Sequence, residues 1–129
     1  MAAHQSRRKA QEIGYPRRGD IYLVNFDPTV GHEIQKTRPA LIVQNDIANR
    51  FSPVTIVAVI TSKFNQSPYP TEVILEPGQS GLSLRSALLL NQIRSVDRRR
   101  LGKRLGRASA ATMRAVEHAL QISLGRTLQ

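Results

Sequence analysis

Residues 18–43 read RGDIYLVNFDPTVGHEIQKTRPALIV, and this stretch decides the fold. Two runs rich in apolar and β-branched residues, 20–26 and 40–44, flank a loop of turn-forming residues, which is typical of paired strands. Pro39 favours an extended backbone at Arg38. The pattern therefore predicts a guanidinium held at the start of a strand, where it can meet a phosphate.

Further short runs with a strand pattern follow along the chain, separated by Pro and Gly turn signals: 54–60, 71–75, 87–90 and 93–96. The last two are either separate strands or one bent strand, and residues 45–53 are expected to form a polar connection. The nearly continuous apolar runs 40–44 and 54–60 suit strands buried on both faces or buried in a subunit interface. This spacing of short strands predicts a mainly β fold, a small barrel.

The C-terminal part departs from the strand pattern. Ser109 is expected to cap a helix that ends at Gly125. Its apolar residues recur at helical spacing: Met113, Val116, Leu120 and Leu124. We expect this face to pack on the protein's own barrel, with partner binding as the alternative.

The size and charge of the chain limit its function. Its 129 residues suit one domain, with 1–16 expected to be a basic flexible arm and 17–129 the folded domain. Nineteen Lys and Arg against nine Asp and Glu give a net charge of +10, which favours a polyanionic partner such as nucleic acid. A basic shell that serves solubility alone is the alternative.

The composition argues against disulfides, metal sites, membrane spans and secretion. The chain has no cysteine, which excludes disulfides and thiolate metal sites. Its Asp, Glu and His residues show no metal-ligand spacing, so no metal or other cofactor is expected. No apolar stretch is long enough to span a membrane, and the N-terminus lacks the hydrophobic region of a secretion signal, so the cytoplasm is the expected location.

A series of short motifs points to a family. In order these are Gly19-Asp20, Asp27-Pro28 with Gly31 and Glu33, Arg38-Pro39, 44–47, 57–61 and 90–94. Together they resemble the MazF/PemK family of toxin endoribonucleases from about residue 17 to 125. The resemblance implies an SH3-like barrel, a homodimer and a cognate antitoxin. It also implies a type II toxin that cleaves single-stranded RNA without metal, leaving a 2′,3′-cyclic phosphate and a 5′-hydroxyl.

The resemblance assigns roles at three positions. Arg38 is implied to be catalytic, Thr61 to assist it by hydrogen bonding the reacting phosphate, and Glu33 to support them. From the residues alone, Arg38 could instead form a surface ion pair with Glu33, and a threonine at a strand end such as Thr61 is usually structural. Because arginine stays protonated, it suits charge stabilisation better than proton abstraction.

Other residues are candidates for RNA contact. They are Gly31, His32, Lys36, Asn45, Ser62 and Gln92. His32 departs from the serine common in the best-known members of the family. The amides of Asn45 and Gln92 can pair with exposed bases, although loop amides more often cap turns. Phe51 and Tyr69 could stack on bases, and burial in the barrel is the favoured alternative.

The densest positive run is 98–100, continued by Lys103, Arg104 and Arg107. Phosphate attraction is the favoured role and a solvated face the alternative. A binding module of the same fold, acting on nucleic acid or a topoisomerase without cleavage, is the second hypothesis for the whole protein. A small ribosome-associated protein would explain the charge but not the placement of Arg38 and Thr61.

Overall fold

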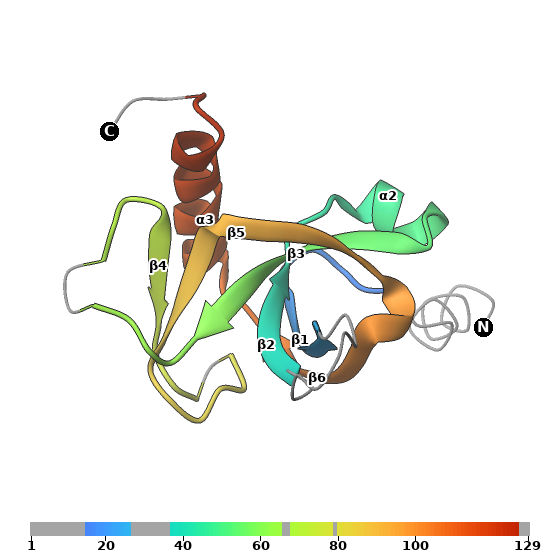
Figure 1. Ribbon diagram of the computed structural model, residues 1–129, viewed down its shortest axis with the longest axis horizontal. Coiled ribbons are helices and arrows are strands. Elements are labelled where there is room, and N and C mark those ends of the chain that lie inside the picture. The colour runs from blue at the N-terminus through green and yellow to red at the C-terminus, as the bar shows by residue number, and fades with distance from the viewer. Residues whose placement is uncertain (1–14, 27–36, 66–67, 79, 127–129) are drawn as a thin grey trace, which may run out of the picture.

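Six antiparallel strands and a C-terminal helix form the fold (Figure 1). The computed structural model describes residues 15–26, 37–65, 68–78 and 80–126. The elements are β1 (Asp20–Asn25), β2 (Thr37–Ile42), α2 (Asp46–Phe51), β3 (Val54–Thr61), β4 (Glu72–Leu75), β5 (Ser86–Asp97), the 3-10 turn η1 (Arg98–Arg100), β6 (Leu101–Arg107) and α3 (Ala110–Ser123). The strand order β4-β5-β3-β2-β1-β6 confirms a mainly β, barrel-like fold whose edges are β4 and β6. No helix in the described ranges is long and apolar enough to cross a membrane.

The bent sheet buries apolar side chains on both faces. One cluster lies between the sheet and α3, and it includes Leu41, Ile60 and Val116. The other lies on the opposite face and includes Ala40 and Ile42. Residues 40–42 are fully buried within a single chain. Their apolar run is therefore explained by the two cores, and a subunit interface is not needed to bury it.

Strand β5 is one bent strand rather than two. Its partner β3 pairs Val59 with Leu89 but Ala58 with Ile93, so three extra residues of β5 bulge out between them. Within this bulge Leu90 is fully buried and its N–H donates to the Thr71 carbonyl at 2.9 Å. The bulge lets β5 pair with β4 at one end and turn towards the second core at the other (Figure 1).

Two glycines allow the β4–β5 connection to approach β6 closely. A Cβ on Gly81 would overlap the Leu105 carbonyl oxygen, and a Cβ on Gly106 would overlap the Ser80 carbonyl oxygen. Gly81 also has a φ of 82°, in the left-handed region that favours glycine. The connection therefore packs backbone against backbone on the edge strand and brings the two edges of the sheet near each other.

Helix α3 confirms the pattern read from the sequence. The Ser109 hydroxyl accepts from the Thr112 N–H at 3.0 Å and caps the helix, and Gly125 follows its end with a φ of 77°. Val116 is buried against the sheet, as expected for a helix packed on its own barrel. Leu124, the last residue of the predicted stripe, is 64% exposed.

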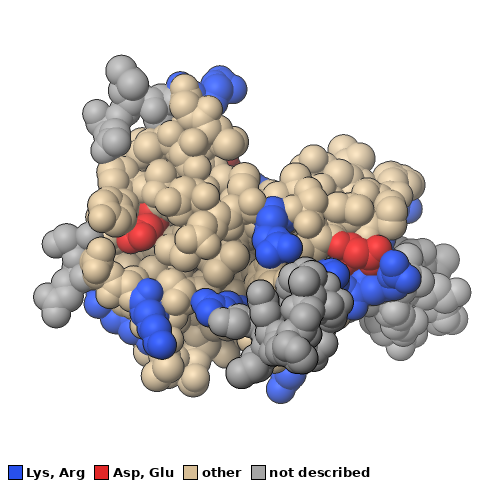
Figure 2. Space-filling view, in the orientation of Figure 1, with Lys and Arg blue, Asp and Glu red and all other residues tan. Residues whose placement is uncertain are grey.

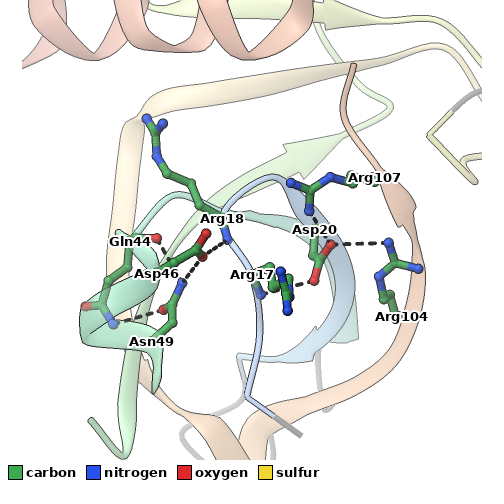
Figure 3. Close-up of polar contacts among 8 residues, drawn as sticks. All are labelled: Arg17, Arg18, Asp20, Gln44, Asp46, Asn49, Arg104 and Arg107. Carbon is green, nitrogen blue, oxygen red and sulfur yellow. Dashed lines mark hydrogen bonds and ion pairs between the residues drawn. The ribbon is translucent and has the colours of Figure 1, made fainter. Parts of the chain in front are cut away.

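The edge strand β6 was not expected from its sequence, LGKRLGR. A buried carboxylate anchors it: Asp20 of β1 accepts from Arg107 at 2.9 Å and lies 3.2 Å from an Arg104 nitrogen (Figure 3). The Arg17 N–H donates to the other Asp20 oxygen at 3.1 Å. Burial, with a smaller contribution from the Asp20 charge, raises the pKa of the nearby Tyr22, while Arg104 opposes this rise.

A short helix, α2, replaces the expected polar connection over 45–53. The Asn45 side chain accepts from the Ala48 N–H at 2.8 Å and starts the helix. Beneath it Asn49 is fully buried, accepts from the Thr55 hydroxyl at 2.7 Å and donates to the Gln44 carbonyl at 2.9 Å. Helix α2 is thus fixed to the sheet by polar contacts, several of which are drawn in Figure 3.

Replacing Asn49 with alanine is expected to reduce the free energy of unfolding by about 2 to 3 kcal/mol, because the buried Thr55 hydroxyl loses its partner. Urea denaturation followed by circular dichroism measures the change. The control is Asn65→Ala at an exposed position, which should change stability by less than about 0.5 kcal/mol. Equal stability of the two variants would contradict the anchoring role.

Candidate active site

Arg38 and Thr61 lie at the same end of two adjacent strands. The β2–β3 ladder pairs Ala40 with Val59, and Arg38 and Thr61 each lie two residues beyond this pair. Since side chains alternate along a strand, Arg38 shares a face with Ala40, and Thr61 shares that face with Val59. The register therefore places a guanidinium and a hydroxyl on the same side of the sheet, where β3 ends and β2 begins.

Both side chains are at least partly exposed to solvent. Arg38 is exposed, and in the described part of the chain no carboxylate lies within ion-pairing distance of it. Thr61 is half-buried, and its hydroxyl accepts from the Lys63 N–H at 3.1 Å. The same hydroxyl lies 3.3 Å from the Lys63 carbonyl, a weak contact that a better acceptor could replace. Ser62, beside it, is exposed.

A second arginine, Arg94, lies on this face of the sheet and was not singled out from the sequence. It pairs with Val57 of β3, and its guanidinium carbon lies 5.1 Å from the centre of the Phe26 ring. Stacking on an aromatic ring orients a guanidinium without using its charge in an ion pair. The sequence shows an arginine within a strand pattern, but its contact with Phe26 depends on how distant segments fold together.

The other predicted residues lie in different places. Gln92 is exposed in the β5 bulge, next to the residues that pair with β3. Asn45 is at the opposite end of β2 from Arg38, and its side-chain oxygen is used as the cap of α2. The remaining predicted residues, Gly31, His32, Glu33 and Lys36, lie outside the described residues.

The basic run 98–100 does not form one continuous patch. Arg98 donates to the Ser52 carbonyl at the end of α2, and Arg100 donates to the Asn25 carbonyl at the end of β1. Arg99 binds Asp97, and the hydrogen bonds from its side chain and its backbone N–H lower the pKa of Asp97 to about 2. On the face shown in Figure 2, lysine and arginine side chains lie mainly along the lower half, with acidic groups at isolated points.

The preferred interpretation of two aromatic residues was wrong. Phe51 and Tyr69 are 75% and 61% exposed, so neither is buried in the barrel. Phe51 belongs to α2, whose inner side is polar, and Tyr69 precedes β4 between two prolines. The described residues include no group of three or more His, Asp or Glu side chains placed to hold a metal ion.

Chemically, this end of the β2–β3 pair can bind a tetrahedral anion. Arg38 offers up to five N–H donors in a fork, and Thr61 offers one hydroxyl donor. Neither group is an effective base at neutral pH, so the geometry suits charge stabilisation at phosphorus rather than proton abstraction.

Comparison with known proteins gives the family. A model of the PemK-like, MazF-like toxins of type II toxin–antitoxin systems matches residues 17–124. The MazE–MazF structure from Deinococcus radiodurans is similar at a TM-score of 0.74 and 30% identity, over 88% of this chain and 98% of that one. An endoribonuclease from a mycobacterial species gives 0.71 and 26%, over 87% and 93%.

A mycobacterial endoribonuclease in complex with its cognate antitoxin gives a TM-score of 0.70 at 26% identity, over 88% of this chain and 99% of that one. The matches therefore extend over nearly the whole length of these relatives. The chain belongs to the family of PemK-like, MazF-like toxins of type II toxin–antitoxin systems.

Proposed function

We propose that the protein is the toxin of a type II system and an endoribonuclease that cleaves single-stranded RNA at the end of the β2–β3 pair. The observation that carries this proposal is the placement of Arg38 and Thr61 on one face of adjacent strands, with no described carboxylate pairing Arg38. Family membership and the endoribonucleases among the similar structures support it.

In the proposed reaction the ribose 2′-oxygen attacks the adjacent phosphorus and the bond from phosphorus to the 5′-oxygen breaks. The 2′-hydroxyl proton passes to a base, and a proton is delivered to the leaving 5′-oxygen, which yields a 2′,3′-cyclic phosphate and a 5′-hydroxyl. Arg38 and Thr61 donate to the phosphoryl oxygens, whose charge grows in the transition state. On the family resemblance, Glu33 remains the residue proposed to support them, by orienting the Arg38 guanidinium, accepting from a base or taking part in proton transfer.

RNA binding would extend along the same face. Arg94, held over Phe26, is placed to contact a neighbouring phosphate, and the exposed amide of Gln92 to contact a base. Gly31, His32, Lys36 and Ser62 remain proposed RNA contacts, while the Asn45 oxygen is already used as a helix cap.

Two partners complete the proposal. The similar structures include complexes with a cognate antitoxin, which supports an antitoxin for this chain as well. With a net charge of +10, the toxin would attract an acidic segment of that antitoxin to the surface that otherwise takes RNA. We also propose a homodimer that acts on RNA in the cytoplasm.

Cleavage of a mixed-sequence single-stranded RNA by the purified protein in EDTA, with sequencing of the new ends, tests the function. We expect discrete cuts whose 5′ ends can be ligated only after phosphorylation by a kinase, because they carry hydroxyl groups. RNA that binds and stays intact would favour the non-catalytic module. Cleavage that appears only after a divalent metal is added would refute the proposed mechanism.

Replacing Thr61 with valine is expected to lower the rate of cleavage by about tenfold to 100-fold, the effect of losing one hydrogen bond to a charged group. Valine keeps the β-branched shape, so the strand end should be unchanged. Single-turnover kinetics at saturating protein measure the rate. The same substitution at Thr71 is the control, and equal rates for both variants would show that the Thr61 hydroxyl takes no part.

A further inference from the structure

Three strand ends meet beside Thr61. Thr61, the last residue of β3, pairs with Ala87 near the start of β5, and Ala87 pairs with Ile74 near the end of β4. Figure 1 shows the end of β3, the end of β4 and the start of β5 lying together. Directly opposed residues share a face of the sheet, so Thr61, Ala87 and Ile74 point to the same side. Residues just beyond these strand ends therefore lie close to the proposed site of cleavage.

An arginine and a glutamate continue the β4–β5 pair at this place. Arg85 precedes β5 and Glu76 follows β4, each two residues from the opposed pair of these strands, and the Arg85 Nε–H donates to Glu76 Oε2 at 3.0 Å. The Arg85 guanidinium carbon also lies 5.8 Å from the centre of the ring of Phe64, three residues after Thr61. Side chains alternate along a strand, so the ion pair belongs to the face of the sheet that carries Thr61.

The ion pair has capacity to bind a further molecule. The side chains of Arg85 and Glu76 are 56% and 67% exposed, and an exposed ion pair typically contributes little to stability. A guanidinium carries five N–H donors and a carboxylate accepts at two oxygens, whereas the hydrogen bond between them uses one donor and one oxygen. The pair therefore offers donors and acceptors side by side to a strand of RNA that is bound at Thr61.

The two charges determine which part of an RNA strand fits the pair. A phosphate is attracted by Arg85 but repelled by Glu76 beside it. The edge of a base carries donors and acceptors together, so it can use both side chains. Guanine fits best, because N1–H and N2–H are neighbouring donors for a carboxylate, while O6 and N7 accept from a guanidinium. Adenine and cytosine offer the carboxylate only an amino group, and uracil only a ring N–H.

We propose that Arg85 and Glu76 recognise a guanine close to the bond that the enzyme cleaves. Glu76 accepts from N1 and N2 of the base, and Arg85 donates to O6 and N7. The Phe64 ring supports the base by stacking, which is favourable for every base and so adds affinity without selectivity. The proposal rests on the proposed function and identifies a determinant of its sequence preference.

Mapping of the cleavage sites in mixed-sequence single-stranded RNA tests the proposal. We expect guanine at one fixed position close to each cut. Arg85→Ala and Glu76→Gln should each lower the preference for guanine at that position by about tenfold to 100-fold, the discrimination typical of paired contacts to a base edge. Arg114→Ala and Glu117→Gln, at exposed positions on α3, are the matched controls and should keep the preference unchanged.

A double variant with the two side chains exchanged separates recognition from a structural role. Glu76→Arg combined with Arg85→Glu keeps an ion pair between the same two positions, so a purely structural pair would leave the preference for guanine intact. We expect the preference to be lost in a protein that is folded by circular dichroism. An exchanged variant that selects guanine as well as the unmodified protein would overturn the proposal.

Binding to strands that cannot be cleaved tests the contacts atom by atom. The probe is a short single strand of 2′-deoxyuridines with one guanine, which has no 2′-hydroxyl to attack phosphorus. Inosine in place of the guanine removes the N2 amino group, and 7-deazaguanine removes the N7 acceptor. Each change should weaken binding to the unmodified protein about tenfold, the effect of losing one hydrogen bond to a charged group. The inosine effect should vanish in Glu76→Gln, and the 7-deazaguanine effect in Arg85→Ala.

Equal affinity for the guanine and inosine strands, or an inosine effect that Glu76→Gln retains, would refute recognition by this pair. The binding experiment does not depend on catalysis, so the two proposals fail separately. RNA that is cut without a preference for guanine refutes only the recognition. Guanine-dependent binding through Arg85 and Glu76, with no cleavage of RNA, refutes only the enzyme.

Discussion

Replacing Arg38 with alanine is expected to lower the rate of RNA cleavage by about 100-fold to 1000-fold and to leave the fold unchanged. The exposed side chain makes no ion pair with the described residues, so its loss removes little from the folded state. A donor aimed at the charge that develops in the transition state affects the rate by this amount. Single-turnover rates at saturating protein measure the chemical step without the binding step.

Two further substitutions make the Arg38 experiment specific. Arg38→Lys keeps the charge but loses the fork of donors, and should restore only a small part of the rate. Arg114→Ala removes one positive charge from the exposed side of α3 and should cleave RNA at close to the normal rate. A folded Arg38→Ala protein with near-normal turnover would refute the catalytic role of this residue.

Replacing Gly81 with alanine is expected to reduce the free energy of unfolding by about 3 kcal/mol. The new Cβ meets two penalties, a positive φ of 82° and an overlap with the Leu105 carbonyl on β6. The first costs about 1 to 2 kcal/mol and the second about 1 to 3 kcal/mol. Urea denaturation of the purified protein gives the change.

Gly78→Ala is the matched control for the Gly81 experiment. Its φ of 101° carries the same kind of strain, but nothing lies within 4 Å of a Cβ built there. The difference between the two variants therefore isolates the steric overlap. Gly106→Ala approaches the same contact from β6 and should be destabilising as well. Equal losses for Gly78 and Gly81 would show that the connection can move away from β6 at no cost.

Much of the fold could be predicted because its signals were local. Ser109 and the apolar spacing that includes Val116 define α3, and the β-branched run at 54–60 defines β3. Strand β6 and helix α2 were missed for a physical reason. The sequence of β6 has few apolar residues, and ladder bonds to β1 and the arginines that bind Asp20 hold it in place. Helix α2 is held through Asn49, which no apolar periodicity can indicate.

The site was predictable only in part. The proline after Arg38 and the apolar run before Thr61 indicated two strand ends, but their side-by-side position depends on the register between β2 and β3. Contacts between segments far apart in the sequence could not be predicted from residue patterns. Two examples are the stacking of Arg94 on Phe26 and the binding of Arg98 and Arg100 to carbonyl groups of different segments. The exposure of Phe51 likewise depends on α2 turning its polar side, with the buried Asn49, towards the sheet.

The bend in β5 affects how the protein unfolds. A single strand supplies Leu88 and Leu90 to the core under α3 and Val96 to the core on the other face. Because both cores include residues of β5, unfolding of one core would distort this strand and weaken the packing of the other core. Partial unfolding is therefore penalised, and the two cores should melt together as one cooperative unit. For the antitoxin proposed above, this favours control by binding to the folded toxin over control by local unfolding.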